Sequence, residues 1–443
     1  MIHDYYKEFS DVHPNIILKA DLNRQGVRIT DKAKEVFKNR DDIHWKGYHF
    51  FSYDVQDPVF YTDHVPATFS LEDGCTIYER TNENSPYSLD YQDGRFVISE
   101  KGEIIADNIR FPPKPKWYDM KLDDGTPMQA IVNAFCGELL FVTFNKYCEF
   151  WNTHDECLFC DINAQMRGQT ESKQETVVAR KDPSIITTVL KVARSLEPQY
   201  WCLYISGGTI LKKYRGQTEI EFYVDRLNAI REGLGGTWFP AGCQIAAQND
   251  ENWKRLHETG VPSIQPNIEV WGEELFNVIC PGKAKSIGWD NWIKRTIRAV
   301  DFWGVGKISP NFVLGVELCR HGFKDVRSAV ENFASGMNFL MDHGVVPRYA
   351  YWTIEPKSQL AGDPIPPLEF FIEAEKTYTE IRWRHGFDPP FPGVYNRFYQ
   401  LSCIYDFEYY HGSGPLSKKW QDERGGPKEH EICAPGGGFG WKV

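Results

Sequence analysis

The hydrophobic pattern of the chain changes near residue 131. Beyond this point, short apolar runs alternate with longer stretches whose apolar residues recur at helical spacing. This alternation is typical of parallel β/α units, in which a helix follows and covers each buried strand. The pattern predicts strands over 139–145, 200–206, 237–247, 263–270, 310–318 and 345–352, and helices over 183–196, 219–234, 251–260, 289–304, 325–344 and 367–386.

These units predict an α/β fold, a partial or open (β/α)6 TIM-like barrel over residues 131–386, whose chemistry should lie at the carboxyl ends of the strands. Residues 1–130 are rich in aromatic residues and poor in helical spacing, which predicts a separate β-rich N-terminal accessory region. Residues 387–443 carry glycine-rich segments, which predict a loop-rich C-terminal cap or tail. In the accessory region, strands are predicted over 50–55, 75–81 and 94–106, followed by a proline-rich connector over 111–119.

The composition narrows the class of protein. Apolar residues make up 42% of the 443 residues and charged residues 25%, which excludes wholesale disorder. The net charge of −11 and the absence of a basic run argue against nucleic acid as a partner. The sequence lacks both a secretory pattern and an apolar run of about 18 residues, so we expect a cytoplasmic protein that does not cross a membrane. Eleven cysteines, an odd number, argue against a disulfide scaffold in such a protein.

Three cysteines follow the first predicted barrel strand. Cys148, Cys157 and Cys160 have the spacing C-x8-C-x2-C, so three thiols on one loop can converge on a single metal centre. Polar residues between them, His154 included, argue against three cysteines that are merely buried. The residue types still allow a Cys3His zinc site completed by His154, a redox pair at Cys157 and Cys160, or a three-cysteine 4Fe-4S cluster with one iron left open. The rest of the chain favours the iron–sulfur cluster.

A glycine-rich segment follows the second predicted strand. It places Ser206, Gly207, Gly208 and Thr209 one β/α unit after the cysteines. Glycine lets the backbone approach a ligand closely, and exposed carbonyl or hydroxyl oxygens can accept hydrogen bonds from an ammonium group. We therefore expect a ligand contact at this strand end.

Polar residues also mark the ends of the fourth and fifth predicted strands. Alternation along the fourth strand places Asn267 and Glu269 on one face, in the same row as Gln265. An amide or a carboxylate at such a place suits two vicinal hydroxyl groups. The fifth strand ends with Gly315 and Glu317.

Together these motifs resemble those of the radical S-adenosylmethionine superfamily over about residues 131–386. The chain has the C-x2-C half of the cysteine motif, with an aromatic residue, Phe159, before the last cysteine. The segment 205–209 resembles the Gly-Gly-Glu motif with Thr209 in the Glu position, and FVLGVEL resembles GxIxGxxE. The first cysteine gap of eight is longer than the three residues of most members. The passage NIEVWGEELFNVICPGK is similar to the biotin-synthase-like branch.

The resemblance implies a radical enzyme. In such an enzyme three cysteines ligate a 4Fe-4S cluster, and reductive cleavage of S-adenosylmethionine gives a 5′-deoxyadenosyl radical that abstracts hydrogen from a small-molecule substrate. It also implies an electron donor such as a ferredoxin or flavodoxin. A zinc-stabilised scaffold protein and a peptide-modifying radical enzyme are the alternatives. The residues implied are Cys148, Cys157 and Cys160 for the cluster, Phe159, Ser206, Gly207, Gly208, Thr209, Asn267, Glu269 and Glu317 for S-adenosylmethionine, and Lys283 and Arg320 for its carboxylate.

Overall fold

Parallel strands form the centre of the molecule. The structure is a computed structural model that describes residues 1–45, 65–135, 139–164, 181–198, 200, 202–387, 401–414 and 416–424. Its six central strands are β8 (Leu139–Asn145), β9 (Cys202–Gly207), β10 (Ala241–Gln244), β11 (Ser263–Gln265), β12 (Asn311–Leu314) and β13 (Arg348–Tyr351). Each lies within, or within one residue of, a strand predicted from the sequence.

The strands pair in chain order. Strands β8 to β11 form one parallel sheet, with β7 (Asn133–Phe135) added antiparallel to β8 at its edge. Strands β12 and β13 pair in parallel as a second, two-stranded sheet. Two isolated parallel bridges, Ile264 to Ile308 and Glu269 to Phe312, join the β11 segment to the β12 segment. Neighbours in the sequence are therefore neighbours in space, as the β/α pattern predicts.

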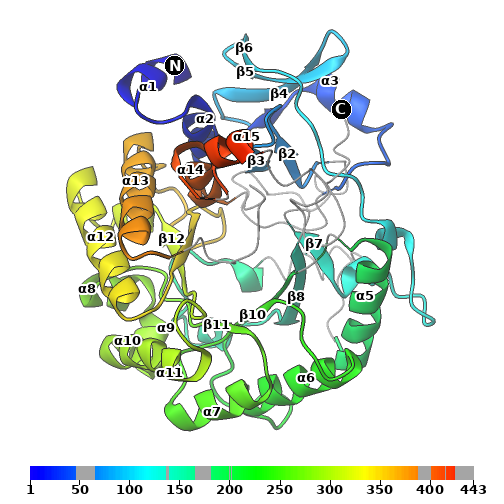
Figure 1. Ribbon diagram of the computed structural model, residues 1–443, viewed down its shortest axis with the longest axis vertical. Coiled ribbons are helices and arrows are strands. Elements are labelled where there is room, and N and C mark those ends of the chain that lie inside the picture. The colour runs from blue at the N-terminus through cyan, green and yellow to red at the C-terminus, as the bar shows by residue number, and fades with distance from the viewer. Residues whose placement is uncertain are drawn as a thin grey trace.

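Helices lie around the outside of these strands (Figure 1). Helix α5 illustrates the cause, because Pro183 occupies its first turn and its buried residues recur every three or four positions. Two short helices, α8 and α9, were not predicted from the sequence. The helices are α5 (Pro183–Leu196), α6 (Glu219–Gly233), α7 (Asp250–Glu258), α8 (Glu273–Ile279), α9 (Pro281–Ser286), α10 (Trp289–Arg298), α11 (Val300–Trp303), α12 (Val326–Asp342) and α13 (Leu368–Arg384).

The N-terminal region combines helices with small sheets. Four strands form one sheet in the order β1-β4-β5-β6, and β2 and β3 form an antiparallel hairpin. The prediction of low helical content is wrong at the start of this region, where three helices are present. The expected strand over 50–55 lies outside the described residues. The elements are α1 (Ile2–Glu8), α2 (Pro14–Gln25), β1 (Arg28–Ile29), α3 (Asp31–Phe37), β2 (Thr68–Ser70), β3 (Thr76–Tyr78), β4 (Tyr87–Gln92), β5 (Arg95–Glu100) and β6 (Glu103–Ala106).

The predicted connector over 111–119 is more than a linker. It contains the 3-10 helix η2 (Lys116–Asp119), whose Trp117 is fully buried. Trp117 packs edge-on against Tyr200, just before β9. A second short turn, η3 (Met128–Ala130), leads into β7. The connector is therefore part of the core, because its indole fills space beside the first parallel strands.

The C-terminal residues pack against the N-terminal ones. The predicted loop-rich tail contains two helices in its described part, α14 (Ile404–His411) and α15 (Lys418–Arg424). Helix α14 is buried, and its Asp406 forms an ion pair of 2.6 Å with Lys19 of α2, both side chains being fully buried. The described part of this segment is thus more helical than the predicted loop-rich cap or tail, and it packs closely, since a buried ion pair needs close packing on all sides. Among the described residues, no helix has the length and apolar character needed to cross a membrane.

Candidate functional site

The cysteine loop begins where β8 ends. Cys148 directly precedes the 3-10 turn η4 (Glu149–Asn152), and the loop then continues to Cys157 and Cys160. The Cys160 N–H donates a hydrogen bond of 2.9 Å to the Cys157 carbonyl, so these two cysteines lie on one tight turn. All three cysteines are half-buried. The loop therefore stands at the carboxyl end of the first parallel strand, as predicted.

An asparagine closes the long first gap of the cysteine motif. The Cys148 N–H donates to Asn163 Oδ1 over 2.9 Å, and Asn163 Nδ2 donates to the Cys148 carbonyl over 3.0 Å. Asn163 is 1% exposed, so water does not compete for these bonds. The chain after Cys160 is thereby fixed to the chain before the gap. Sequence reasoning missed Asn163, because nothing in its local pattern separates it from other polar loop residues.

The glycine segment after β9 lies directly against the cysteine loop. A Cβ atom on Gly208 would stand 2.5 Å from the Tyr147 carbonyl oxygen and 2.6 Å from the Cys148 nitrogen, so only glycine fits. The Glu149 N–H donates to the Thr209 carbonyl over 2.9 Å. The structure therefore brings together two predicted parts of the site, the first cysteine and the Gly208–Thr209 pair.

A carboxylate of the cysteine loop holds the same glycine segment from its other end. Glu149 Oε2 accepts hydrogen bonds from the N–H groups of Leu211, over 2.6 Å, and Lys212, over 2.9 Å. Glu219, the first residue of α6, accepts from Ile210 over 3.2 Å and from the Gln248 side chain over 3.0 Å. Burial raises the pKa of Glu219 to about 7. Two carboxyl groups thus fix the segment after Gly208.

The opposite flank of the cysteine loop contacts the junction of α8 and α9. The Leu158 N–H donates to the Ile279 carbonyl, and the Gly282 N–H donates to the Asp155 carbonyl, each over 2.9 Å. A Cβ atom on Gly282 would stand 2.3 Å from the ring of Phe150, so this approach also requires glycine. The cysteine loop is therefore held between the β9 end and the α8–α9 junction.

One buried ion pair lies beside the cysteines. Lys283 Nζ donates to Glu269 Oε1 over 2.7 Å and to the Asn267 carbonyl over 2.8 Å. A hydrogen bond with the Cys280 thiol lowers the pKa of Cys157, and the nearby Lys283 ammonium lowers it further. Burial raises the pKa of the Cys280 thiol itself. These pKa directions favour the thiolate form at Cys157, the form that binds metals.

The thiols fit an iron–sulfur cluster by their chemistry, because thiolates are the ligands of such clusters. They are close enough for the charge of Cys157 to raise the pKa of both Cys148 and Cys160, although burial is the larger cause. Within the described residues, His, Cys, Asp and Glu side chains form no group of three or more placed to hold a metal ion. His154, the fourth ligand of the zinc alternative, is exposed and has a φ of 55°.

The predicted alternation along the fourth strand is wrong. Strand β11 ends at Gln265 because Pro266 follows, which has no N–H for strand pairing, and Glu269 has a φ of 73°. Asn267 does not point to a free site, since its Oδ1 accepts from the Asn311 N–H over 3.0 Å. Glu269 instead forms the ion pair with Lys283.

The remaining predicted residues lie in separate surroundings. Glu317, in the 3-10 turn η5 (Val316–Leu318), is 1% exposed and accepts from the Gly315 N–H over 2.7 Å. Burial raises its pKa to about 7, and its Oε1 has no hydrogen-bond partner among the described residues. Arg320 forms an ion pair with Asp363 and donates to the Ala361 carbonyl over 2.9 Å. Phe159 is half-buried against the core.

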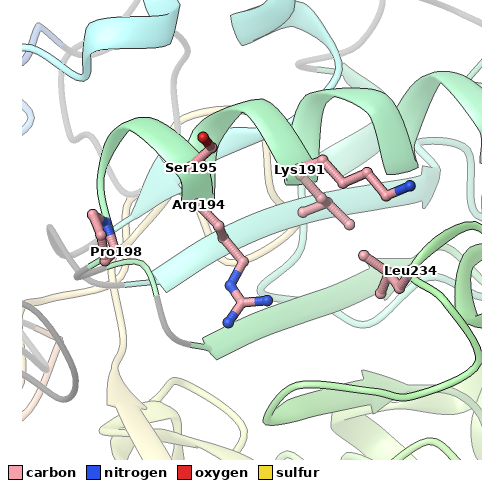
Figure 2. Close-up of a pocket in the computed structure, with 6 residues that line it drawn as sticks. Lys191, Arg194, Ser195, Pro198 and Leu234 are labelled. Atoms are coloured by element: carbon pink, nitrogen blue, oxygen red, sulfur yellow. The ribbon is translucent and has the colours of Figure 1, made fainter.

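A separate pocket lies on the outer helices. Its volume is about 370 Å³, and Figure 2 shows its lining side chains on the second half of α5, just after α5 and just beyond the end of α6. Helices of β/α units run back from the carboxyl to the amino ends of the strands, so this pocket stands at the end opposite to the cysteine loop. It does not belong to the candidate site. The residues are Leu190, Lys191, Arg194, Ser195, Pro198 and Leu234.

The chain is similar to a curated protein and, more faintly, to several solved structures. No protein-family profile matches the chain. A curated relative, the bacteriochlorophyllide c C-7(1)-hydroxylase of Chlorobaculum limnaeum, is 22% identical over 286 residues, which cover 62% of this chain and 67% of the relative.

Solved structures show fainter likeness. The FeFe-hydrogenase maturase HydG matches 58% of this chain, with a TM-score of 0.38 and a sequence identity of 16%. Methylornithine synthase (PylB) matches 59% of this chain, with a TM-score of 0.39 and a sequence identity of 14%. The match spans 51% of HydG, about half of its length, and 71% of methylornithine synthase.

The resemblance to the radical S-adenosylmethionine superfamily is carried by the cysteine, glycine and strand-end motifs of the sequence.

Proposed function

We propose that the chain is a radical enzyme that uses S-adenosylmethionine to abstract hydrogen from a small-molecule substrate in a partial (β/α)6 barrel. Cys148, Cys157 and Cys160 hold a 4Fe-4S cluster in this proposal. The main support is the direct contact of the cysteine loop with Gly208 and Thr209, which joins the cluster ligands and the ligand-binding backbone in one unit.

A cluster held by Cys148, Cys157 and Cys160 would supply, together with S-adenosylmethionine, the radical chemistry, and the protein would provide the surroundings for it. Gly208 brings the backbone close to the sulfur ligands, and the Thr209 region offers oxygen atoms to the amino group of S-adenosylmethionine. Glu149 holds this segment in place through the Leu211 and Lys212 N–H groups. Preorganised backbone of this kind reduces the reorganisation needed when the ligand binds.

Lys283 and Glu269 have a positioning role in this proposal. Their ion pair is buried, with 8% exposure for each residue, and the ammonium also binds the Asn267 carbonyl. The pair therefore keeps a positive charge beside Cys157, which favours the thiolate. In this proposal the electron that reduces the cluster comes from a small protein of the ferredoxin or flavodoxin kind. The curated relative is named as a hydroxylase, and hydroxylation is one reaction that hydrogen abstraction can begin.

Anaerobic reconstitution tests the proposed function. The loaded protein should be brown, contain about four iron and four sulfide per chain, and form 5′-deoxyadenosine from S-adenosylmethionine with dithionite. Cys157→Ala should lose the iron and the product. Cys202→Ala is the matched control, because Cys202 is a buried cysteine of β9 outside the loop. A colourless protein with one zinc ion, or equal iron loading in both variants, would contradict the proposal.

A further inference from the structure

The pocket on the outer helices is lined by two basic side chains one helical turn apart. Lys191 and Arg194 both belong to the second half of α5, and Figure 2 shows Leu234 across from them, just beyond the end of α6. Residues three positions apart in a helix are neighbours on its surface. The cavity of about 370 Å³ therefore receives both positive charges from one helix.

Neither basic group has an acidic partner within the described part of the chain. No described carboxylate lies at ion-pair distance from Lys191 or Arg194, and the Arg194 Nε atom is buried there without a hydrogen-bond acceptor. Acidic residues are not scarce, since the chain has 61 of them against 50 lysines and arginines. Like charges at this spacing repel each other, and an anion bound between them would remove the repulsion.

The Arg194 guanidinium is held in place by an aromatic ring. Its central carbon lies 4.0 Å from the centroid of the buried Phe239 ring. Stacking on a ring face fixes the guanidinium plane and leaves the N–H groups along its edge for a ligand. Burial lowers the pKa of Arg194, and no described carboxylate acts against this effect. The protein therefore keeps a half-buried positive charge here without an acidic group of its own.

Arg226 of α6 provides a contrast. It is also half-buried, and its guanidinium carbon lies 3.6 Å from the centroid of the Phe222 ring. Burial lowers the pKa of Arg226 too, but Asp182 and Asp225 are near enough to offset part of this effect. A stacked arginine can thus receive counter-charges from this chain. At Arg194 the chain provides a cavity instead.

The other lining groups fit a phosphate attached to an apolar body. Ser195 adds a hydroxyl next to Arg194, and the apolar part of the lining consists of Leu190, Pro198 and Leu234. A phosphate monoester has close to two negative charges at neutral pH and three acceptor oxygens, which suit a guanidinium, an ammonium and a hydroxyl together. A carboxylate has one charge and would leave one cation unpaired. Pockets of roughly 300–1,000 Å³ hold small molecules, so the cavity has room for more than the phosphate.

The helix ends oppose an anion only in part. Helix α5 ends at Leu196 and α6 at Gly233, so the last turns of both expose carbonyl oxygens near the pocket. Each helix end corresponds to about −0.5 elementary charge, and the two cations exceed the sum by about one charge. The helix ends thus explain how the empty pocket tolerates two cations, and a positive excess remains for a ligand.

We propose that Lys191, Arg194 and Ser195 bind the phosphate group of a small phosphate monoester, whose apolar body packs against Pro198 and Leu234. The site lies at the end of the strands opposite to the cysteine loop, so its ligand is remote from the proposed cluster. The inference therefore goes beyond the proposed function and does not depend on it.

Phenyl phosphate is the probe, and titration calorimetry of the full-length reconstituted protein measures its dissociation constant. Saturating S-adenosylmethionine keeps the probe away from the cysteine loop. Phenyl phosphate should bind more tightly than inorganic phosphate, which lacks the apolar body, and than benzoate, which has a single charge. Arg194→Gln should weaken its binding about tenfold or more, because a charged hydrogen-bond donor is lost. Arg226→Gln is the matched control and should bind it as the wild type does.

A second variant covers the case in which Arg194→Gln does not fold. Lys191 is exposed, so Lys191→Glu should keep the thermal unfolding temperature, and its carboxylate would pair with Arg194 and abolish binding. The inference would be overturned by a wild type that does not bind phenyl phosphate or binds benzoate or inorganic phosphate as tightly. Unchanged affinity in Lys191→Glu, or an equal loss in Arg226→Gln, would also overturn it. Iron, sulfide and 5′-deoxyadenosine assays on the same samples report separately on the proposed function.

Discussion

Asn163 and Cys148 are joined by two hydrogen bonds between one side-chain amide and both main-chain groups of the cysteine, across 15 residues of sequence. The amide takes the place that a neighbouring strand would have in a sheet. A first gap of eight residues can therefore form a defined loop without further secondary structure beyond the turn η4.

Replacing Asn163 should loosen the first cysteine. Asn163→Ala leaves the buried N–H and carbonyl of Cys148 without partners, which costs about 1–3 kcal/mol, and iron loading should fall severalfold. Asn163→Asp keeps the acceptor for the Cys148 N–H and should load more iron than Asn163→Ala. Iron analysis and electron paramagnetic resonance of the reduced protein measure the effect. Unchanged loading in Asn163→Ala would show that the amide is dispensable.

A methyl group at Gly208 should push two segments apart. In Gly208→Ala the new Cβ meets main-chain atoms of Tyr147 and Cys148, which cannot rotate away. Overpacking of this kind costs about 1–3 kcal/mol, and both iron content and affinity for S-adenosylmethionine should decrease. Equilibrium dialysis with labelled S-adenosylmethionine measures the affinity. Gly414→Ala is the control, because its nearest atom would be 3.9 Å away; a loss of equal size there would remove the steric explanation.

Glu317 should make stability depend on pH. Burial raises its pKa from about 4.5 to about 7, so the folded protein holds this proton more tightly than the unfolded chain. Its stabilising contribution is complete below pH 4.5 and is lost as the pH rises through 7. Relative to Glu317→Gln, the wild-type free energy of unfolding should fall by up to about 1.4 kcal/mol per pH unit in this window. Urea unfolding of both proteins at pH 5, 6, 7 and 8 measures this, and parallel curves would rule it out.

The buried pair of Lys19 and Asp406 should be sensitive to the loss of one partner. Asp406→Asn leaves a buried ammonium without its carboxylate, and the free energy of unfolding should fall by about 3–5 kcal/mol. The double variant Lys19→Met with Asp406→Leu removes both charges and should recover most of that loss. Urea unfolding at pH 7 compares the three proteins. A single variant as stable as the wild type would mean that solvent reaches this pair.

Local patterns were sufficient to predict the central part of the fold. The limits of β8 and α5 agree with the sequence because each has a strong apolar pattern and, in α5, a proline at the start. The prediction missed α8 and α9 because Cys280 and Pro281 divide them into pieces too short to show a helical period. It failed after Gln265 because one proline ended the strand.

The site could be predicted only for residues that follow closely after a strand. The three cysteines and Gly208 are close in sequence to strand ends, and the β/α pattern brings those ends together. Asn163 could not be found in this way, since its role depends on a partner 15 residues away.

The contact between α2 and α14 has a consequence for synthesis of the protein. Lys19 precedes its partner Asp406 by 387 residues in the sequence and therefore leaves the ribosome much earlier. During most of translation this ammonium has to remain hydrated, so the first helices cannot reach their final packing early. A shortened gene that ends before α14 should therefore yield aggregated product, even though it encodes every strand of the central sheets.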